Sequence, residues 1–93
     1  MKIKDFKLIN KGALVARLSI EFPELDLTIR DCIILSGANG QWLKMPSKPF
    51  EIDGKKCYYE YVVFAPERKK EVEREVFDKL KDALPKNSHT EFV

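Results

Sequence analysis

The chain has 93 residues and a formal net charge of +2, with an apolar fraction of 44% and a charged fraction of 34%. This length allows one domain with a modest core and excludes a second one. No apolar run approaches the roughly 20 residues that span a bilayer. The opening residues, MKIKD, lack the apolar core of a secretory signal. We therefore expect no membrane segment and a cytoplasmic location.

Two strands are predicted at the start of the chain, over residues 2–9 and 13–22. In the first, Ile3 and Phe6 cannot share a face in a period of two, so a bulge or a late strand start is expected. The second alternates apolar and polar residues, which is typical of a half-buried antiparallel strand, and Arg17 lies on its polar side. Pro23 ends this strand.

A β-hairpin is predicted over residues 25–45. Its first strand shifts its apolar pattern by one residue near Asp31, and its second strand runs from Gln41 to Met45. Asn39-Gly40 lies between the two apolar runs, and both residue types tolerate a positive φ, so we expect the turn there. Pro46 then ends the second strand because it lacks a backbone donor.

The residues that follow predict a long connection over 46–56 and a last strand over 55–64. The connection contains a turn at Asp53-Gly54. The strand is rich in β-favouring residues, including Tyr58, Tyr59 and Tyr61. These tyrosines are interpreted either as cross-strand packing or as platforms on which nucleic-acid bases stack.

The end of the chain predicts an amphipathic helix that opens at Pro66 and ends at Pro85, followed by a flexible tail over 85–93. Apolar residues recur at helical spacing, and acids occupy the opposite side. The apolar stripe consists of Val72, Val76, Leu80, Ala83 and Leu84, bordered by Phe77. Basic side chains, including Lys70 and Arg74, line the flanks, where ion pairing within the helix accounts for them without any ligand.

These elements predict an α+β fold, with a small antiparallel sheet of about five strands and one C-terminal amphipathic helix packed on it. A single domain over residues 1–84 contains all of them. A small open sheet leaves at least one edge strand unpaired.

The chemistry of the side chains argues against an enzyme. Cys32 and Cys57 lie in apolar strand patterns, so we expect buried thiols rather than a disulfide or metal ligands. The single histidine, His89, lies in the polar tail, far in sequence from either cysteine. No nucleophile accompanies a base. We therefore predict no catalytic residue, no metal, no cofactor and no small-molecule substrate.

The distribution of charge is uneven although the net charge is small. Residues 1–20 are basic, residues 21–31 are acidic, and the segment after the hairpin is basic again. The lysines of that later segment are Lys44, Lys48, Lys55 and Lys56. This pattern indicates either a basic binding face or a mixed solvated surface.

The stretch from Ile29 to Lys48 resembles the SpoVG family, small bacterial regulators of septation and sporulation that bind nucleic acid. The matching features are Ile29-x-Asp31, Gly37-x-Asn39-Gly40, Trp42 and Met45-Pro46-Ser47-Lys48. The resemblance extends over about residues 1–84. It implies a homodimer that acts on gene expression, septation or sporulation without catalysis, by binding DNA or alternatively RNA.

Within that resemblance, Lys48 is the predicted nucleic-acid contact because it is the basic residue of the Met-Pro-Ser-Lys motif. Charge placement alone adds further candidates, namely Lys44, Lys55, Lys56, Lys70 and Arg74. Contacts from lysine and arginine to phosphates give affinity with little base readout. The alternative function is a protein-interaction adaptor that docks a partner on a sheet edge or on the charged helix.

Overall fold

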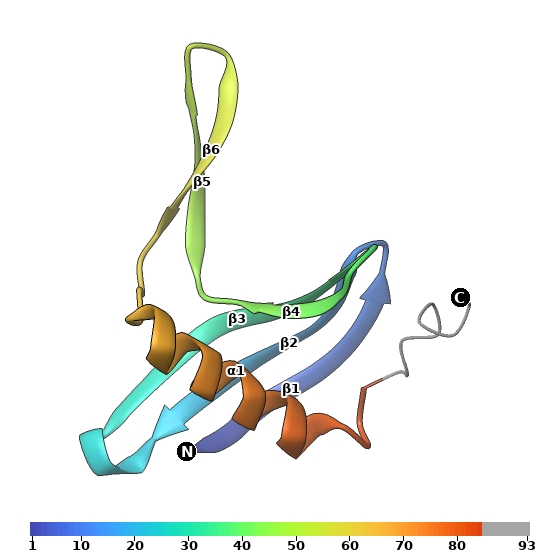
Figure 1. Ribbon diagram of the computed structural model, residues 1–93, viewed down its shortest axis with the longest axis vertical. Helices are drawn as coiled ribbons and strands as arrows, with labels where there is room; N and C mark the ends of the chain where they lie inside the picture. Colours follow the sequence, from blue (N-terminus) through green and yellow to red (C-terminus); the bar gives the residue numbers. More distant parts are fainter. Residues whose placement is uncertain (85–93) are drawn as a thin grey trace.

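The computed structural model describes residues 1–84, which form two antiparallel sheets and one helix (Figure 1). The predicted α+β class with one C-terminal helix is confirmed. The strands β1 to β4 form one sheet in sequence order, and β5 pairs only with β6. The bounds are β1 Lys2–Lys11, β2 Leu14–Phe22, β3 Leu27–Gly37, β4 Gly40–Lys44, β5 Ser47–Ile52, β6 Lys55–Glu60 and α1 Pro66–Leu80, with a 3-10 turn at Pro23–Leu25. The predicted tail and His89 lie outside the described residues.

The second sheet corrects the prediction of a long connection over residues 46–56. Asp53 and Gly54 both have positive φ, 53° and 78°. A two-residue turn of this kind matches the twist of paired strands, so the chain folds straight back into a hairpin. Pro49 is tolerated because β5 has an edge without a partner. The last strand accordingly ends at Glu60, four residues earlier than predicted.

Both predicted irregularities are present as bulges. Asp5 has a φ of 54°, and the β1–β2 register shifts between Lys4 and Lys7. Asp31 has a φ of 61° at the equivalent break between β2 and β3. Short polar side chains adopt this left-handed region at low cost. Because the first bulge adds one residue, Lys4 and Lys7 lie on the same face of the sheet although they are three positions apart.

The predicted hairpin over residues 25–45 forms, but its turn lies one residue earlier than expected. Gly37 and Gly40 are the closing pair, and the loop is Ala38-Asn39. Gly40 has a positive φ of 114°. A side chain at Gly37 would meet the indole of Trp42, whose Cζ3 lies 3.1 Å from the position of a Cβ. The glycine thus leaves room for the indole at this position.

The core lies between α1 and one face of the four-stranded sheet. Val72, Val76 and Leu80 are buried there, as the helical stripe predicts. Ala83 is exposed, however, because α1 ends at Leu80 and the following turn returns Leu84 to the core. The backbone N–H of Leu43 donates to Glu73 Oε2 at 2.8 Å, which ties the helix to the edge strand β4.

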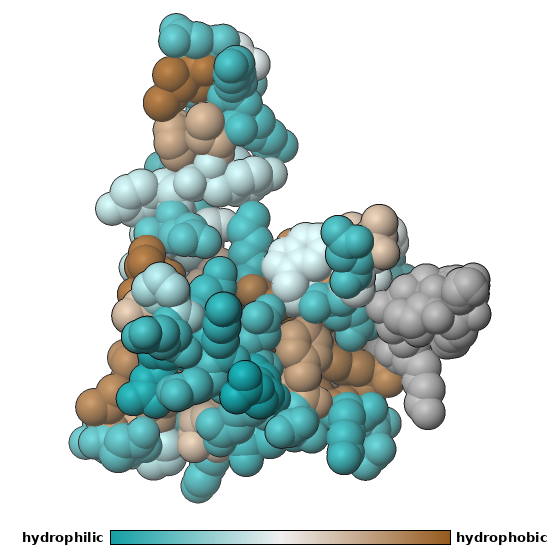
Figure 2. All heavy atoms as spheres, in the orientation of Figure 1, coloured by the Kyte–Doolittle hydropathy of each residue, from teal (hydrophilic) through white to brown (hydrophobic). Residues whose placement is uncertain are grey.

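The hairpin of β5 and β6, residues 47–60, is called the arm. It projects away from the four-stranded sheet and from α1 (Figure 1). At its base, the N–H of Tyr61 donates to the carbonyl of Pro46 at 3.1 Å. Met45 is buried on one side of the base, and the rings of Phe64 and Phe22 pack at 6.1 Å on the other. Beyond the base no arm residue is buried, and Figure 2 shows hydrophobic atoms on the arm, well away from the body.

Candidate nucleic-acid interface

The sheet face that α1 leaves open carries three basic side chains in one row across the strands, with Ile33 between two of them. Lys7 of β1 is paired with Arg17 of β2, Arg17 with Ile33 of β3, and Ile33 with Lys44 of β4. Residues directly opposite each other point to the same face. The next positions along, Ala16, Ile34 and Leu43, point to the buried face. Lys7, Arg17 and Lys44 are called the basic row.

The basic row is electrostatically uncompensated. Lys7 lies opposite Arg17 on the neighbouring strand, and like charges in this position destabilise a sheet. Among residues 1–84 none of the three row residues forms an ion pair. On the same strands Lys4 is neutralised by Glu21 at 3.2 Å. Within the described residues, the row therefore has no carboxylate at ion-pair distance, in contrast to Lys4.

Lys44 connects the basic row to the arm. Its ammonium lies 3.8 Å from the ring centroid of Tyr58, a cation–π contact. Tyr58 is on β6 and pairs with Pro49 on β5. The open sheet face therefore continues onto one face of the arm.

The two faces of the arm differ in charge. Cross-strand pairing places Lys48 with Tyr59, Phe50 with Cys57, and Ile52 with Lys55, all on one face. The other face carries Glu51 opposite Lys56 and Ser47 opposite Glu60, together with the Pro49–Tyr58 pair. The first face has two lysines and no carboxylate, and it is called the aromatic face. The second face mixes both signs.

A shallow hollow lies on the aromatic face. It is lined by Lys48, Phe50, Tyr59 and Tyr61. The rings of Tyr59 and Tyr61 meet edge to face, with centroids 5.7 Å apart and planes at 74°. Exposed rings beside a lysine are the groups on which nucleobases stack while a phosphate is held.

The structure therefore divides the predicted basic residues into separate surfaces. Lys48 and Lys55 share the aromatic face, Lys56 lies on the opposite face of the arm, and Lys44 belongs to the basic row. Lys70 and Arg74 are exposed on α1, which covers the other side of the sheet. The two helix residues and the basic row do not form one surface.

Ion pairing on α1 occurs as the alternative interpretation expects, but with other partners. Arg68 pairs with Glu71 at 3.1 Å, and Lys79 with Glu75 at 4.0 Å. Each partner is well exposed, so these pairs contribute little to stability.

Lys7 and Arg17 were not among the predicted site residues. The alternation of residues 13–22 placed Arg17 on the polar side of its strand. Nothing in the sequence aligned it with Lys7, because the bulge at Asp5 changes the register. The row depends on pairing between strands that are far apart in sequence.

No protein-family model, curated protein or solved structure matches this chain. The resemblance to the SpoVG family therefore stays a prediction that rests on residues 29–48.

The cysteines differ in environment. Cys32 is fully buried, as predicted, whereas Cys57 is only partly buried, because the arm has no core. Burial, with a smaller contribution from the nearby Asp31 carboxylate, raises the pKa of the Cys32 thiol to about 12.

Within residues 1–84, no three Cys, His, Asp or Glu side chains lie close enough together to bind a metal ion. No helix in the same range is long and apolar enough to cross a membrane.

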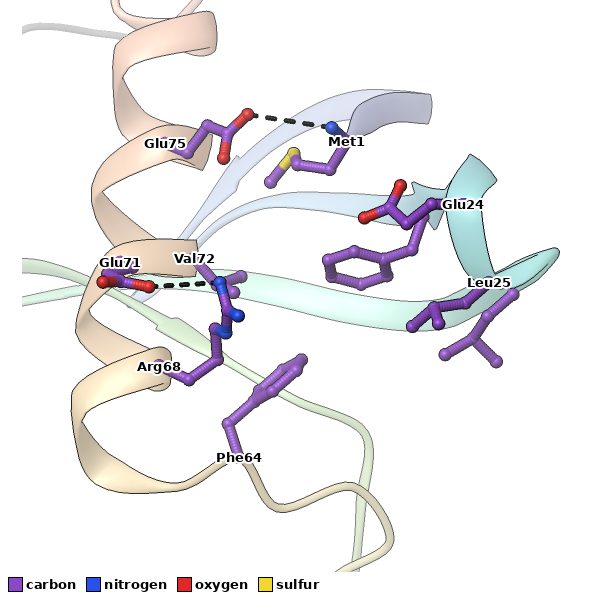
Figure 3. Close-up of a pocket in the computed structure, with 10 residues that line it drawn as sticks. Met1, Glu24, Leu25, Phe64, Arg68, Glu71, Val72 and Glu75 are labelled. Atoms are coloured by element: carbon purple, nitrogen blue, oxygen red, sulfur yellow. Dashed lines mark hydrogen bonds and ion pairs between the residues drawn. The ribbon is translucent and has the colours of Figure 1, made fainter.

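A second hollow, of about 490 Å³, lies between α1 and the turn that joins β2 to β3 (Figure 3). Its apolar lining includes Phe22, Leu25 and Phe64, and Leu25 is exposed. Glu71 and Glu75 border it, held by Arg68 and by the N-terminal ammonium of Met1, which is 3.8 Å from Glu75. This hollow is called the acidic groove.

Proposed function

We propose that this protein is a SpoVG-like, non-enzymatic regulator that binds DNA, or alternatively RNA, as a cytoplasmic homodimer. The observation that supports it is the basic row on the open sheet face. Three cations lie in one row with no carboxylate among them, and Lys7 lies directly opposite Arg17, at a cost to the stability of the sheet. A phosphate backbone removes that repulsion. Regulation of septation or sporulation follows from the family resemblance.

The mechanism is electrostatic attachment. Strands in a sheet are about 4.8 Å apart, so the row from Lys7 to Lys44 extends about 14 Å, enough to meet more than one phosphate. Each neutralised phosphate releases condensed counterions, so affinity falls steeply as salt rises. Lys48 and Lys55 on the aromatic face add phosphate contacts from the arm. Such contacts give affinity with little sequence preference.

The proposal is tested by the salt dependence of binding to random-sequence DNA. Arg17→Ala and Lys48→Ala should each weaken binding and reduce the slope of log K against log salt by about one unit. Both losses should be similar for specific and random DNA. Arg74→Ala is the matched control, because Arg74 is an exposed arginine on α1, on the other side of the sheet. The salt dependence of binding by this variant should have the same slope as that of the unaltered protein.

Two outcomes would contradict the proposal in different ways. Unchanged affinity of folded Arg17→Ala protein removes the basic row from the interface. A loss confined to one DNA sequence would mean that the altered side chain reads a base rather than a phosphate.

The acidic groove favours a second candidate function, a protein-interaction adaptor. Its exposed Leu25 lies across the hollow from the carboxylates of Glu71 and Glu75, a combination that suits a basic, partly apolar segment of another protein (Figure 3). This function requires no nucleic acid. Absence of any DNA or RNA binding at low salt would favour the adaptor function over nucleic-acid binding through the basic row.

A further inference from the structure

Three aromatic rings on the arm are exposed side by side. Phe50, Tyr59 and Tyr61 have exposed fractions of 38%, 60% and 59%, and all three line the hollow beside Lys48. Large aromatic side chains contribute most to stability when they are buried, and contiguous exposed apolar surface marks a site of interaction. The body of the protein does not cover these rings, because the arm projects away from it (Figure 1).

The charges around the rings indicate the chemistry of the occupant. Lys48 and Lys55 lie on the aromatic face, whereas Glu51 and Glu60 lie on the other face. A surface with ring faces and ammonium groups but no carboxylate complements a planar base attached to a phosphate. A peptide segment would instead pair through its backbone with an open edge of β5 or β6 rather than stack on these rings.

The side chains also discriminate between single-stranded and double-stranded nucleic acid. A two-stranded ribbon fits the major groove of a duplex, where base edges are read by hydrogen-bonding side chains, chiefly arginine, lysine, asparagine and glutamine. Of these types the aromatic face has only Lys48 and Lys55, and its other side chains are apolar or aromatic. Ring stacking, in contrast, needs the flat face of a base, which is covered by neighbouring bases in a duplex and accessible in a single strand.

We infer that the hollow lined by Lys48, Phe50, Tyr59 and Tyr61 stacks the bases of single-stranded nucleic acid. This inference rests on the proposed function, and it specifies single-stranded nucleic acid as the class of ligand. Tyr61 lies six positions after Lys55, just past the end of β6, so the aromatic face extends about 20 Å, enough for a short run of nucleotides. A single strand can also turn over the narrow arm toward Lys44, whereas a stiff duplex cannot.

The test compares three 5′-labelled oligomers of twelve units by fluorescence anisotropy at low salt. They are oligo-dT, a sugar–phosphate oligomer without bases, and a duplex. Oligo-dT should bind about tenfold or more tightly than the oligomer without bases, because stacking adds to the phosphate contacts. Tyr59→Leu should remove most of that advantage without changing the affinity for the oligomer without bases. Tyr59→Phe keeps the ring and should bind oligo-dT as the unaltered protein does.

Leu25→Ala is the control, since Leu25 is an exposed apolar residue on the body, away from the arm and from the basic row. Its affinity for oligo-dT should change less than twofold.

Equal binding of oligo-dT and the oligomer without bases overturns the inference but leaves the proposed function standing. Absence of binding to all three oligomers overturns both. A Tyr59→Leu variant that changes the mass in light scattering, with oligo-dT affinity unchanged, would assign the aromatic face to a second copy of the chain and also overturn the inference.

Discussion

Within residues 1–84, five short polar residues hold the backbone in the left-handed region, at the turns and bulges of the fold. They are Asp5, Asn10, Asp26, Asp31 and Asp53, with φ between 49° and 61°. Asn and Asp tolerate this region better than other side chains except glycine. Asp5 has a direct effect on the candidate interface, because its bulge brings Lys7 onto the face of Arg17. Replacing Asp5 by a β-branched residue would strain the conformation on which this alignment depends.

Cys32 predicts a loss of stability at alkaline pH. Its pKa is about 12 in the folded protein against a reference value of 9.0. Above pH 9 the unfolded chain loses the thiol proton while the folded chain keeps it. The free energy of unfolding should therefore be unaffected by this group below pH 9 and should fall as the pH rises from 9 toward 12. Urea unfolding at several pH values measures this, and Cys32→Ala should show a smaller alkaline decline.

At the level of the helix, Leu80 and Lys79 provide an internal comparison. Leu80 is buried in the core, so Leu80→Ala should lower the free energy of unfolding by about 2 to 5 kcal/mol. Lys79 is largely exposed and makes one long ion pair with Glu75, so Lys79→Ala should change it by less than about 0.5 kcal/mol. Thermal and urea unfolding measure both. Equal losses of stability in the two variants would contradict this packing of α1.

The elements with strong local patterns could be predicted from the sequence, whereas the arm could not. The stripe of Val72, Val76 and Leu80 repeats at helical spacing, and burial of one helix face follows from it directly. The segment 47–52 has no such pattern, because Pro49 argues against a strand and Phe50 and Ile52 face no core. Only the Asp53-Gly54 turn indicated a hairpin there.

The candidate interface was predictable only in part for the same physical reason. The motif around Lys48 is local, so the sequence identified it. The alignment of Lys7, Arg17 and Lys44 is set by register and by a bulge, which combine strands separated along the chain. The charge of the arm faces likewise depends on which residues pair.

For the whole molecule, the open edges of the two sheets determine where the expected homodimer can form. The β1 edge is a poor surface for pairing, because Asp5 interrupts it and four lysines would repel a second copy: Lys2, Lys4, Lys7 and Lys11. On the β4 edge, Glu73 occupies the N–H of Leu43. On the arm, β5 carries Lys48 and Pro49, so we expect two copies to pair along residues 57–60 of β6, where neither lysine nor proline interrupts the edge. Light scattering at micromolar concentration should give twice the mass of one chain, and a monomer mass at all concentrations would contradict the dimer.

The isolation of the arm has a consequence for hydrogen exchange. An unsupported two-stranded hairpin is marginally stable in water, so its amides should exchange through local opening, long before those of β2 and β3. A partner that binds the arm stabilises its closed form in proportion to the logarithm of ligand concentration over Kd. Deuterium uptake over residues 47–60 should then slow, while uptake in the body stays the same. Exchange in this one segment therefore reports where a partner binds, whatever its chemical class.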